Sequence, residues 1–244
     1  MQGSGAASGP AGKQTFMITQ LPLAVQLSPE ISLADFIPGG NAQLLDQLNQ
    51  LAHGESRSNL FLSGPQASGK SHLLMGLCAQ AQTLNCAYLP LGEVKDHSPD
   101  ILQGLDQVDL LALDDIHQIA GRKDWEEALF VLFNQRQAME RPMVFSALQG
   151  PAQLPLELSD LRSRLCWAGS YRILPLDDDG LAELLRQQAG KRGLVMDEVA
   201  IRWLLSRHQR NARQLLNILD TLDRAALAAK KPRLTLPFVQ AQLH

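Results

Sequence analysis

The residues at 64–71 constrain the fold of this chain most, because they have the spacing G-x-x-x-x-G-K-S of a phosphate-binding loop (P-loop). An apolar run at 59–63 precedes the loop and another follows His72, which predicts a strand, a loop and a helix in that order. Glycines let such a backbone wrap around a phosphate, and the positive end of the following helix faces the same anion. We expect Lys70 to reach the β- and γ-phosphates of a nucleotide and the Ser71 hydroxyl to bind Mg²⁺. The nucleotide-binding residues predicted here are Gly64, Gln66, Ala67, Ser68, Gly69, Lys70, Ser71 and His72.

The composition is that of a folded protein. Of 244 residues, 45% are hydrophobic and 19% are charged, which allows a sizeable core. The formal net charge of −3 gives no sign of a general nucleic-acid binder, although a local basic patch is left open. The three cysteines lack the spacing of a zinc site and are expected to be small buried hydrophobic residues. Because the chain has neither a membrane-spanning run nor the pattern of a signal peptide, we expect it in the cytoplasm.

Short apolar segments alternate with amphipathic ones between residues 29 and 174, which is typical of a parallel sheet covered by helices on both faces. Strands are expected at 59–63, 87–91, 108–115, 142–147 and 171–174. Helices are expected at 41–53 (capped by Asn41), 100–105, 125–139 and 158–165. The prediction is an α/β fold with five parallel strands.

After Pro175 the pattern changes to helices alone. Asp177 or Asp178 is expected to cap a helix reaching 190, and Asp197 a second one reaching 207. Further helices are expected at 212–229 and from Thr235 onward. We therefore predict a flexible tail at 1–28, an α/β nucleotide-binding domain at 29–174 and a small all-helical lid domain at 175–244. Whether residues 1–15 are native is left open.

The apolar run at 110–113 ends in two carboxylates, Asp114 and Asp115. P-loop proteins complete their metal site with an acidic group at the end of a neighbouring strand. We expect Asp114 to hold Mg²⁺, directly or through water, and Asp115 to orient or deprotonate the attacking water. Arg164 and Arg213 are candidates for phosphate contacts, although their spacing alone assigns neither a role.

Taken together, the P-loop, the run at 109–121 with its Asp-Asp-Ile, the pair Phe133-Asn134 and the segment at 36–41 resemble the AAA+ ATPases, and within them the DnaA-related family. The match extends from about Leu33 to the C-terminus. This resemblance implies ADP or ATP with Mg²⁺ as cofactors, and it implies that Ile37 and Pro38 border the adenine. It also implies that Arg164 is a catalytic arginine finger reaching a neighbouring subunit's nucleotide, and that Arg213 contacts the chain's own nucleotide from the lid.

Full-length initiators carry a C-terminal helix-turn-helix that reads DNA, whereas this sequence runs only to His244, soon after the expected lid. That arrangement resembles the Hda type of DnaA-related regulator, which inactivates DnaA. The peptide at 20–25 resembles the Q-L-x-L motif with which this type binds the β sliding clamp of DNA polymerase III. Gln20, Leu21 and Leu23 would then be the clamp contacts, and an edge strand is the alternative. The implied partners are DnaA, the clamp and, through the clamp, DNA; a homo-oligomer is left open.

One departure from the family concerns hydrolysis at the chain's own site. Initiators place a polar residue just after the strand at 142–147, where this chain has Leu148, with Ser146 as a candidate substitute. Own-site hydrolysis is therefore left open. The favoured function is a negative regulator of replication initiation that promotes hydrolysis of DnaA-bound ATP. The alternatives are a helicase-loader-type ATPase that acts by its own ATP cycle on single-stranded DNA and, more distantly, a nucleotide-gated interaction module without catalysis.

Overall fold

The computed structural model describes residues 31–208 and 211–243. Its central element is a five-stranded parallel sheet, which confirms the expected number and direction of strands. The strands are β1 (Leu60–Ser63), β2 (Cys86–Pro90), β3 (Leu110–Asp114), β4 (Met143–Ala147) and β5 (Gly169–Arg172), and their order is β2-β3-β4-β1-β5. The carboxyl ends of β1, β3 and β4, which precede the P-loop, Asp115 and Leu148, therefore meet at one edge of the sheet.

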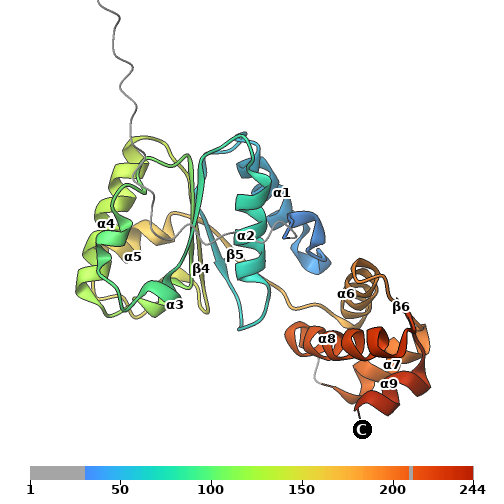
Figure 1. Ribbon diagram of the computed structural model, residues 1–244. Coiled ribbons are helices and arrows are strands. Elements are labelled where there is room, and N and C mark those ends of the chain that lie inside the picture. Colours follow the sequence, from blue (N-terminus) through green and yellow to red (C-terminus); the bar gives the residue numbers. More distant parts are fainter. Residues whose placement is uncertain (1–30, 209–210, 244) are drawn as a thin grey trace, which may run out of the picture.

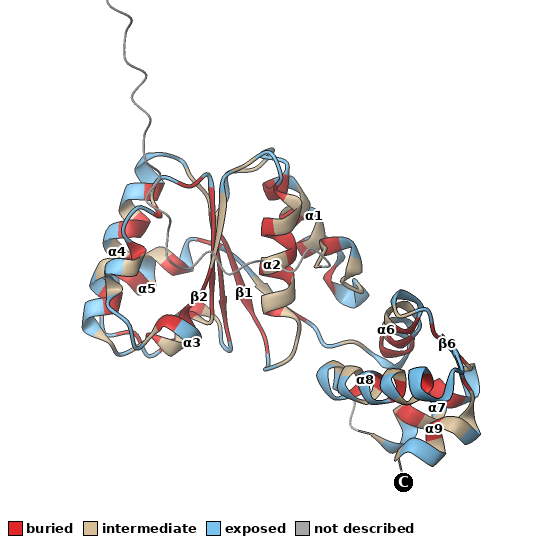
Figure 2. Ribbon diagram, in the orientation of Figure 1, coloured by how far each residue is buried: buried red, intermediate tan, exposed pale blue. Residues whose placement is uncertain are grey.

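Helices cover both faces of this sheet (Figure 1). One face carries α1 (Ala42–Ala52) and α2 (Lys70–Gln80), and the other carries α3 (Leu91–Val94), α4 (Lys123–Ala138) and α5 (Ser159–Cys166). Successive residues of a strand point to opposite faces, and both faces of the central strands are apolar. Leu110 and Ala112 accordingly pack with the α2 side chains, whereas Leu111 and Leu113 pack with those of α4. Figure 2 shows buried residues along the strands and on the helix faces that meet them.

Short 3-10 turns complete this part of the chain. They cover Leu33–Asp35, Gly39–Asn41, Pro99–Leu102, Ile116–Gln118 and Pro151–Gln153. The helix expected at 100–105 is thus only the turn at Pro99–Leu102, because the backbone enters the left-handed region at Gly104 (φ 82°). The last strand begins at Gly169, two residues earlier than expected, because the Gly169 N–H donates to the Asn59 carbonyl beside β1.

The C-terminal part is built from α6 (Asp178–Lys191), α7 (Glu198–Arg207), α8 (Ala212–Ala229) and α9 (Leu236–Leu243) around an apolar core of its own. Asp177 caps α6 by accepting from the Gly180 N–H. The expectation of helices alone was wrong, because β6 (Val195–Met196) pairs in parallel with β7 (Arg233–Leu234). Two-residue strands are too short to show a period of two in a sequence. The cap expected from Asp197 was also wrong, since its carboxylate accepts from the Arg233 guanidinium at 2.9 Å.

The cysteines follow the expectation only in part. Cys78 is buried, but Cys86 is half-buried and Cys166 is exposed at the end of α5. The pKa of the Cys78 thiol is raised by a hydrogen bond with Cys86 and by burial. None of the helices in the described part of the chain is long and apolar enough to cross a membrane.

A buried arginine holds the turns that lead into two central strands. Arg136 of α4 is fully buried, and its Nη1 donates to the carbonyls of Leu105 (2.6 Å) and Val108 (2.9 Å), ahead of β3. Its Nη2 donates to the carbonyls of Pro142 (2.8 Å), ahead of β4, and Asp109 (3.4 Å). Burial lowers the pKa of Arg136 to about 10, and the neighbouring Arg141 adds to the shift. The guanidinium thus provides donors for loop carbonyls ahead of β3 and adds a second donor to the Pro142 carbonyl, which also accepts from the Leu111 N–H.

Candidate functional site

The P-loop runs from the end of β1 to the first turn of α2, as the sequence predicted. Gly69 takes a left-handed conformation (φ 93°), and a Cβ there would lie 2.7 Å from the Phe36 ring. A Cβ on Gly64 would lie 2.9 Å from the Ser68 hydroxyl oxygen. Both positions therefore exclude a side chain, because Phe36 and Ser68 lie directly against the loop backbone there. Ala67 is also left-handed (φ 61°), at a cost of roughly 1 kcal/mol that glycine would not incur.

Lys70 is buried at the start of α2. Its ammonium donates to the loop carbonyls of Gly64 (2.9 Å) and Pro65 (2.8 Å). Burial lowers the pKa of this lysine, while the charges of Asp115 and Asp114 act in the opposite direction. The charge of Lys70 therefore lies between the loop and the two carboxylates. Ser71 follows it in the first turn of α2 and is half-buried.

Asp114 ends β3, and both of its carboxylate oxygens accept hydrogen bonds. Tyr88 on β2 donates its hydroxyl to one oxygen at 2.8 Å, and Ser146 on β4 donates to the other. The Ser146 oxygen also accepts from the Asp115 N–H at 2.9 Å. This arrangement follows from the strand order, because β2 and β4 flank β3. Sequence reasoning missed Tyr88, whose place in a short apolar strand gave no signal of its contact.

Asp115 lies just beyond the strand in a left-handed conformation (φ 59°). Burial raises the pKa of its carboxyl, the charge of Asp114 adds to the shift, and His117 and Lys70 oppose it. A carboxylate whose pKa is raised in this way is suited to accept a proton from water. Leu148, by contrast, is 43% exposed beyond the end of β4. The polar group that contacts the carboxylates from β4 is thus Ser146.

The residues at this edge fit a magnesium-bound nucleotide. The Ser68 hydroxyl oxygen is buried without a hydrogen-bond partner among the described residues, inside the loop between Gly64 and Gly69. The N-terminus of α2 and the Lys70 ammonium supply positive charge, and Asp114 with Ser71 supplies oxygen ligands for a hard cation. This set of donors and acceptors matches a phosphate chain and its metal.

The segment expected to border the adenine lies beside the P-loop helix. Ile37 is half-buried and Pro38 is exposed. The preceding Phe36 stacks on His72 of α2, with ring centroids 6.3 Å apart. The prediction that Asn41 caps α1 was wrong, because its amide instead donates to the Leu174 carbonyl (3.1 Å) and accepts from the Leu174 N–H (2.9 Å). A backbone partner of this kind, distant in the sequence, satisfies more of the amide than a cap would.

The two arginines occupy different parts of the fold. Arg164 lies in the last turn of α5, where its guanidinium carbon is 4.5 Å from the centre of the Trp167 ring. The buried Glu126 of α4 fixes the entry to α5 by accepting from the N–H groups of Leu158 (2.7 Å) and Glu157 (3.2 Å). Arg213 is exposed in the first turn of α8 and is not brought into contact with the P-loop in this structure. Gln20, Leu21 and Leu23 lie outside the described residues.

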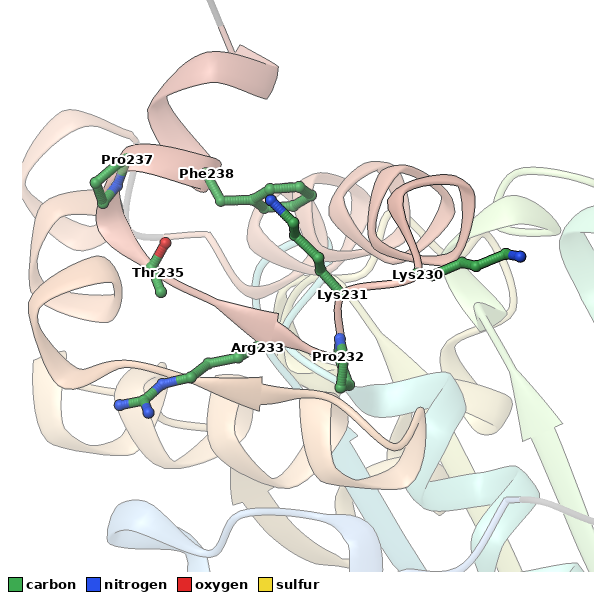
Figure 3. Close-up of a pocket in the computed structure, with 7 residues that line it drawn as sticks. All are labelled: Lys230, Lys231, Pro232, Arg233, Thr235, Pro237 and Phe238. Carbon is green, nitrogen blue, oxygen red and sulfur yellow. The ribbon is translucent and has the colours of Figure 1, made fainter.

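A separate hollow of about 540 Å³ lies in the C-terminal part, between the end of α8 and the start of α9 (Figure 3). It contains none of the predicted site residues. Of its three cations, Arg233 is paired with Asp197, and the two lysines follow the C-terminus of α8, where positive charge complements the helix dipole. The hollow is therefore explained by local structure and is not the nucleotide site. The residues that line it are Lys230, Lys231, Pro232, Arg233, Thr235, Pro237 and Phe238.

Two family models match the chain. A model of the bacterial DnaA ATPase domain matches residues 93–170, and a model of the Hda lid domain matches residues 177–243. Among solved structures, domain III of the Thermotoga maritima initiation protein DnaA is similar over 88% of this chain and 96% of that chain, with a TM-score of 0.77 and 20% identity. AMPPCP-bound DnaA from Aquifex aeolicus has a TM-score of 0.69 and 22% identity, over 80% of this chain and 65% of that chain. The RuvB Holliday junction branch migration motor of Thermotoga maritima has a TM-score of 0.68 and 20% identity, over 89% of this chain and 72% of that chain.

The parallel sheet, the P-loop geometry and the separate helical part give this protein the AAA+ fold, with an α/β core and a C-terminal helical lid. At these identities the solved structures establish the fold alone, and the two matched models supply the narrower relationship. Over residues 93–170 and 177–243, the matched models relate this chain to the DnaA/Hda-related AAA+ proteins.

Removing the Lys70 ammonium is expected to weaken nucleotide binding strongly. A lysine that donates to phosphate oxygens contributes about 1.5–3 kcal/mol, so Lys70→Ala should raise the Kd for ADP by roughly 10- to 100-fold. Isothermal titration with ADP and Mg²⁺ measures the change. Lys123→Ala is the matched control, because that lysine is exposed on α4 and its ion pair is with Glu127 on the same helix. An unchanged Kd for Lys70→Ala would contradict the prediction that the P-loop binds the nucleotide.

The half-buried His72 is expected to reduce the stability of the fold in mild acid. Burial lowers its pKa, while Asp35 and the Ser32 backbone oppose the shift. The unfolded chain takes up this proton below about pH 6.5, whereas the folded chain resists it. His72 therefore contributes a loss of stability as the pH falls through 6.5 towards its lowered folded pKa.

Thermal unfolding of the nucleotide-free protein at pH 7.5 and 5.5 measures this effect. The decrease in Tm between the two values should be smaller for His72→Gln than for the wild type. His53→Gln serves as the control, since its imidazole is exposed at the end of α1. Equal decreases in all three proteins would contradict the assignment to His72.

Proposed function

We propose that this protein, loaded with adenine nucleotide, docks on ATP-bound DnaA in the cytoplasm and promotes hydrolysis of the ATP held by DnaA. The observation that carries the proposal is the combination of a DnaA-type ATPase match with an Hda-type lid match in one chain. The conversion of DnaA to its ADP form would limit replication initiation. The partner's nucleotide would be the substrate.

The nucleotide of this chain would be ADP or ATP with Mg²⁺. The P-loop amides and Lys70 would hold its phosphates, and Ser71 and Asp114 would hold the metal, which supplies charge neutralisation when bound. Ile37 and Pro38 would border the adenine, and Arg213 would reach the phosphates from the lid. Tyr88 and Ser146 hold the Asp114 carboxylate in one orientation, because each occupies one of its oxygens. Asp115 would position water if the chain also turns over its own nucleotide.

Arg164 would act on the partner. It is half-exposed at the end of α5, and no carboxylate among the described residues neutralises it. A guanidinium fork matches the geometry of phosphate oxygens and keeps its charge at all physiological pH values. Inserted beside the γ-phosphate of a neighbouring subunit, it would stabilise the charge that develops in the transition state. Arginine fingers supplied in this way increase the rate by about 10³–10⁵.

The test is a reconstituted hydrolysis assay. DnaA loaded with radiolabelled ATP is mixed with this protein, the β clamp and DNA, and ADP formation is followed with time. The expected result is fast, clamp-dependent conversion that needs this protein in catalytic amounts. A rate equal to that of DnaA alone would reject the proposal.

The peptide at 20–25 would tether the protein to the clamp and, through it, to DNA. Burial of a leucine side chain contributes about 1.5–3 kcal/mol, so Leu21→Ala should weaken clamp binding about tenfold or more. Replacing Gln20 with Ala as well should remove the hydrogen bonds that set the position of the peptide on the clamp. Surface plasmon resonance on immobilised clamp measures the loss, with Leu27→Ala beyond the motif as control. Retained affinity in the double variant would return the segment to the edge-strand interpretation.

A helicase-loader-type ATPase is the second candidate. It is favoured by the intact arrangement of Lys70, Asp114 and Asp115, and by the raised pKa of Asp115. That function requires ATP turnover by the isolated chain, stimulated by single-stranded DNA. A coupled assay for ADP release with and without oligonucleotide separates the two candidates. Size-exclusion chromatography with light scattering in the same buffers tests for a homo-oligomer.

A further inference from the structure

At the C-terminal end of α5, the side chain of Trp167 contacts that of Arg164. The guanidinium carbon of Arg164 lies 4.5 Å from the centre of the Trp167 ring, within the range of a cation–π contact. The pairing follows from the local backbone, because residues three apart on a helix share a face and the Trp167 N–H donates to the Arg164 carbonyl at 3.1 Å. The backbone at the end of the helix thus brings the two side chains together.

Trp167 is 64% exposed, so the core does not require it. A large aromatic side chain left in water at this position contributes little to folding, whereas its face covers one side of the Arg164 guanidinium. The contact is therefore expected to affect the conformation of the Arg164 side chain more than the stability of the fold.

Arg164 has few other constraints on its conformation. Within residues 31–208 and 211–243 its side chain forms no ion pair and no hydrogen bond in this structure. A free arginine side chain carries about 2 kcal/mol of rotamer entropy, which it loses when it is held at a phosphate. A neighbour that restricts the side chain beforehand reduces that loss.

The base of this arrangement is rigid. Glu126 is fully buried and accepts from the N–H groups of Gly121, Glu157 and Leu158, which ties the entry of α5 to α4. Leu161 and Leu165 on the inner side of α5 are buried in the sheet core. The helix is therefore fixed, and the freedom that remains at its outer end is that of the Arg164 side chain.

We propose that Trp167 is a positioning residue that holds the Arg164 guanidinium in an outward, preorganised conformation for insertion at a partner's nucleotide. This inference rests on the proposed function of Arg164, but it makes a separate claim about the protein alone. Because an exposed cation–π contact is weak, Trp167→Ala should lower the maximal stimulated rate of ATP hydrolysis by only about two- to fivefold. Trp167→Phe keeps an aromatic face and should restore most of the rate.

The first experiment uses the isolated protein. The ring current of Trp167 should shift the Arg164 Nε–H resonance upfield in a ¹⁵N-correlated NMR spectrum, assigned by its absence in Arg164→Lys. The resonance should move to the ordinary arginine position in Trp167→Ala and remain shifted in Trp167→Phe. An Arg164 resonance that is unshifted in the wild type would overturn the inference whatever the fate of the proposed function.

The second experiment measures ADP formation on DnaA with clamp and DNA over a range of concentrations of each variant. Positioning predicts a lower maximal rate with the same half-maximal concentration for Trp167→Ala. An unchanged maximal rate with a higher half-maximal concentration would make Trp167 a partner contact and overturn the inference. Full activity of Trp167→Ala beside an inactive Arg164→Ala would do the same while leaving the proposed function intact. If Arg164→Ala itself kept full stimulation, the proposed function would fail, and the NMR result would still decide the role of Trp167.

Discussion

Arg164→Ala is expected to return ATP hydrolysis, in a mixture of DnaA, clamp, DNA and this protein, to the rate of DnaA alone, a fall of about 10³-fold or more. The reason is the loss of the Arg164 guanidinium in the last turn of α5, whose charge and forked donors fit phosphate oxygens. Radiometric conversion of DnaA-bound ATP to ADP measures the effect. Binding of the variant to DnaA should change far less than the rate, because the contact forms fully only in the transition state.

Arg162→Ala is the matched control, since Arg162 is on the same helix two residues earlier and therefore on a different face. It should retain stimulation, and both variants should have wild-type circular dichroism and Tm. Stimulation that survives in Arg164→Ala would mean that DnaA completes its own catalytic site and that this protein acts by docking alone.

Arg136→Met is expected to destabilise the fold by about 3–5 kcal/mol, because it removes the donors to the buried Leu105 and Val108 carbonyls before β3 and one of the two donors to the Pro142 carbonyl before β4. Methionine fills much of the same volume, so the loss reports the hydrogen bonds more than a cavity. Urea unfolding followed by fluorescence measures the change, which should appear as a lower midpoint with an unchanged m-value.

Arg57→Met provides the comparison, because Arg57 pairs with Glu140 at 3.0 Å with both side chains mostly exposed. Its effect should stay below about 1 kcal/mol. Comparable losses in the two variants would show that the buried contacts of Arg136 add nothing beyond a surface ion pair.

Motifs with a fixed spacing made the core of the site predictable from the sequence. The P-loop and the Asp114-Asp115 pair each end a short apolar strand, and a parallel sheet gathers such ends at one edge. Tyr88 could not be found in this way, since its contact with Asp114 depends on which strands are neighbours. The role proposed for Trp167 could not be predicted from the sequence either, because it depends on the contact of its ring with the Arg164 guanidinium.

The errors have physical causes of the same kind. Asn41 has the residue type and position of a helix cap, but a distant backbone unit at Leu174 outcompetes the local N–H groups. The pairing of β6 with β7 joins segments almost forty residues apart, each too short to show periodicity. The tail at 1–28, the boundary at 174–175 and the roles of the individual site residues stay predictions.

The two hydrogen bonds between the Asn41 amide and the Leu174 backbone also fix where the α/β part ends and the connection to the helical part begins. The amide of Asn41 holds the Leu174 peptide at both its N–H and its carbonyl, so the chain is anchored to the sheet up to that residue. Asp177 begins the cap of α6, and Leu176 already packs against the apolar core of the helical part, which leaves Pro175 between the two packed units. Proline fixes φ at this position, which restricts the orientations that the helical part can take relative to the sheet. The ion pair between Asp35 and Lys191, 2.5 Å long, adds a second connection, from the turn at Leu33–Asp35 to the last turn of α6.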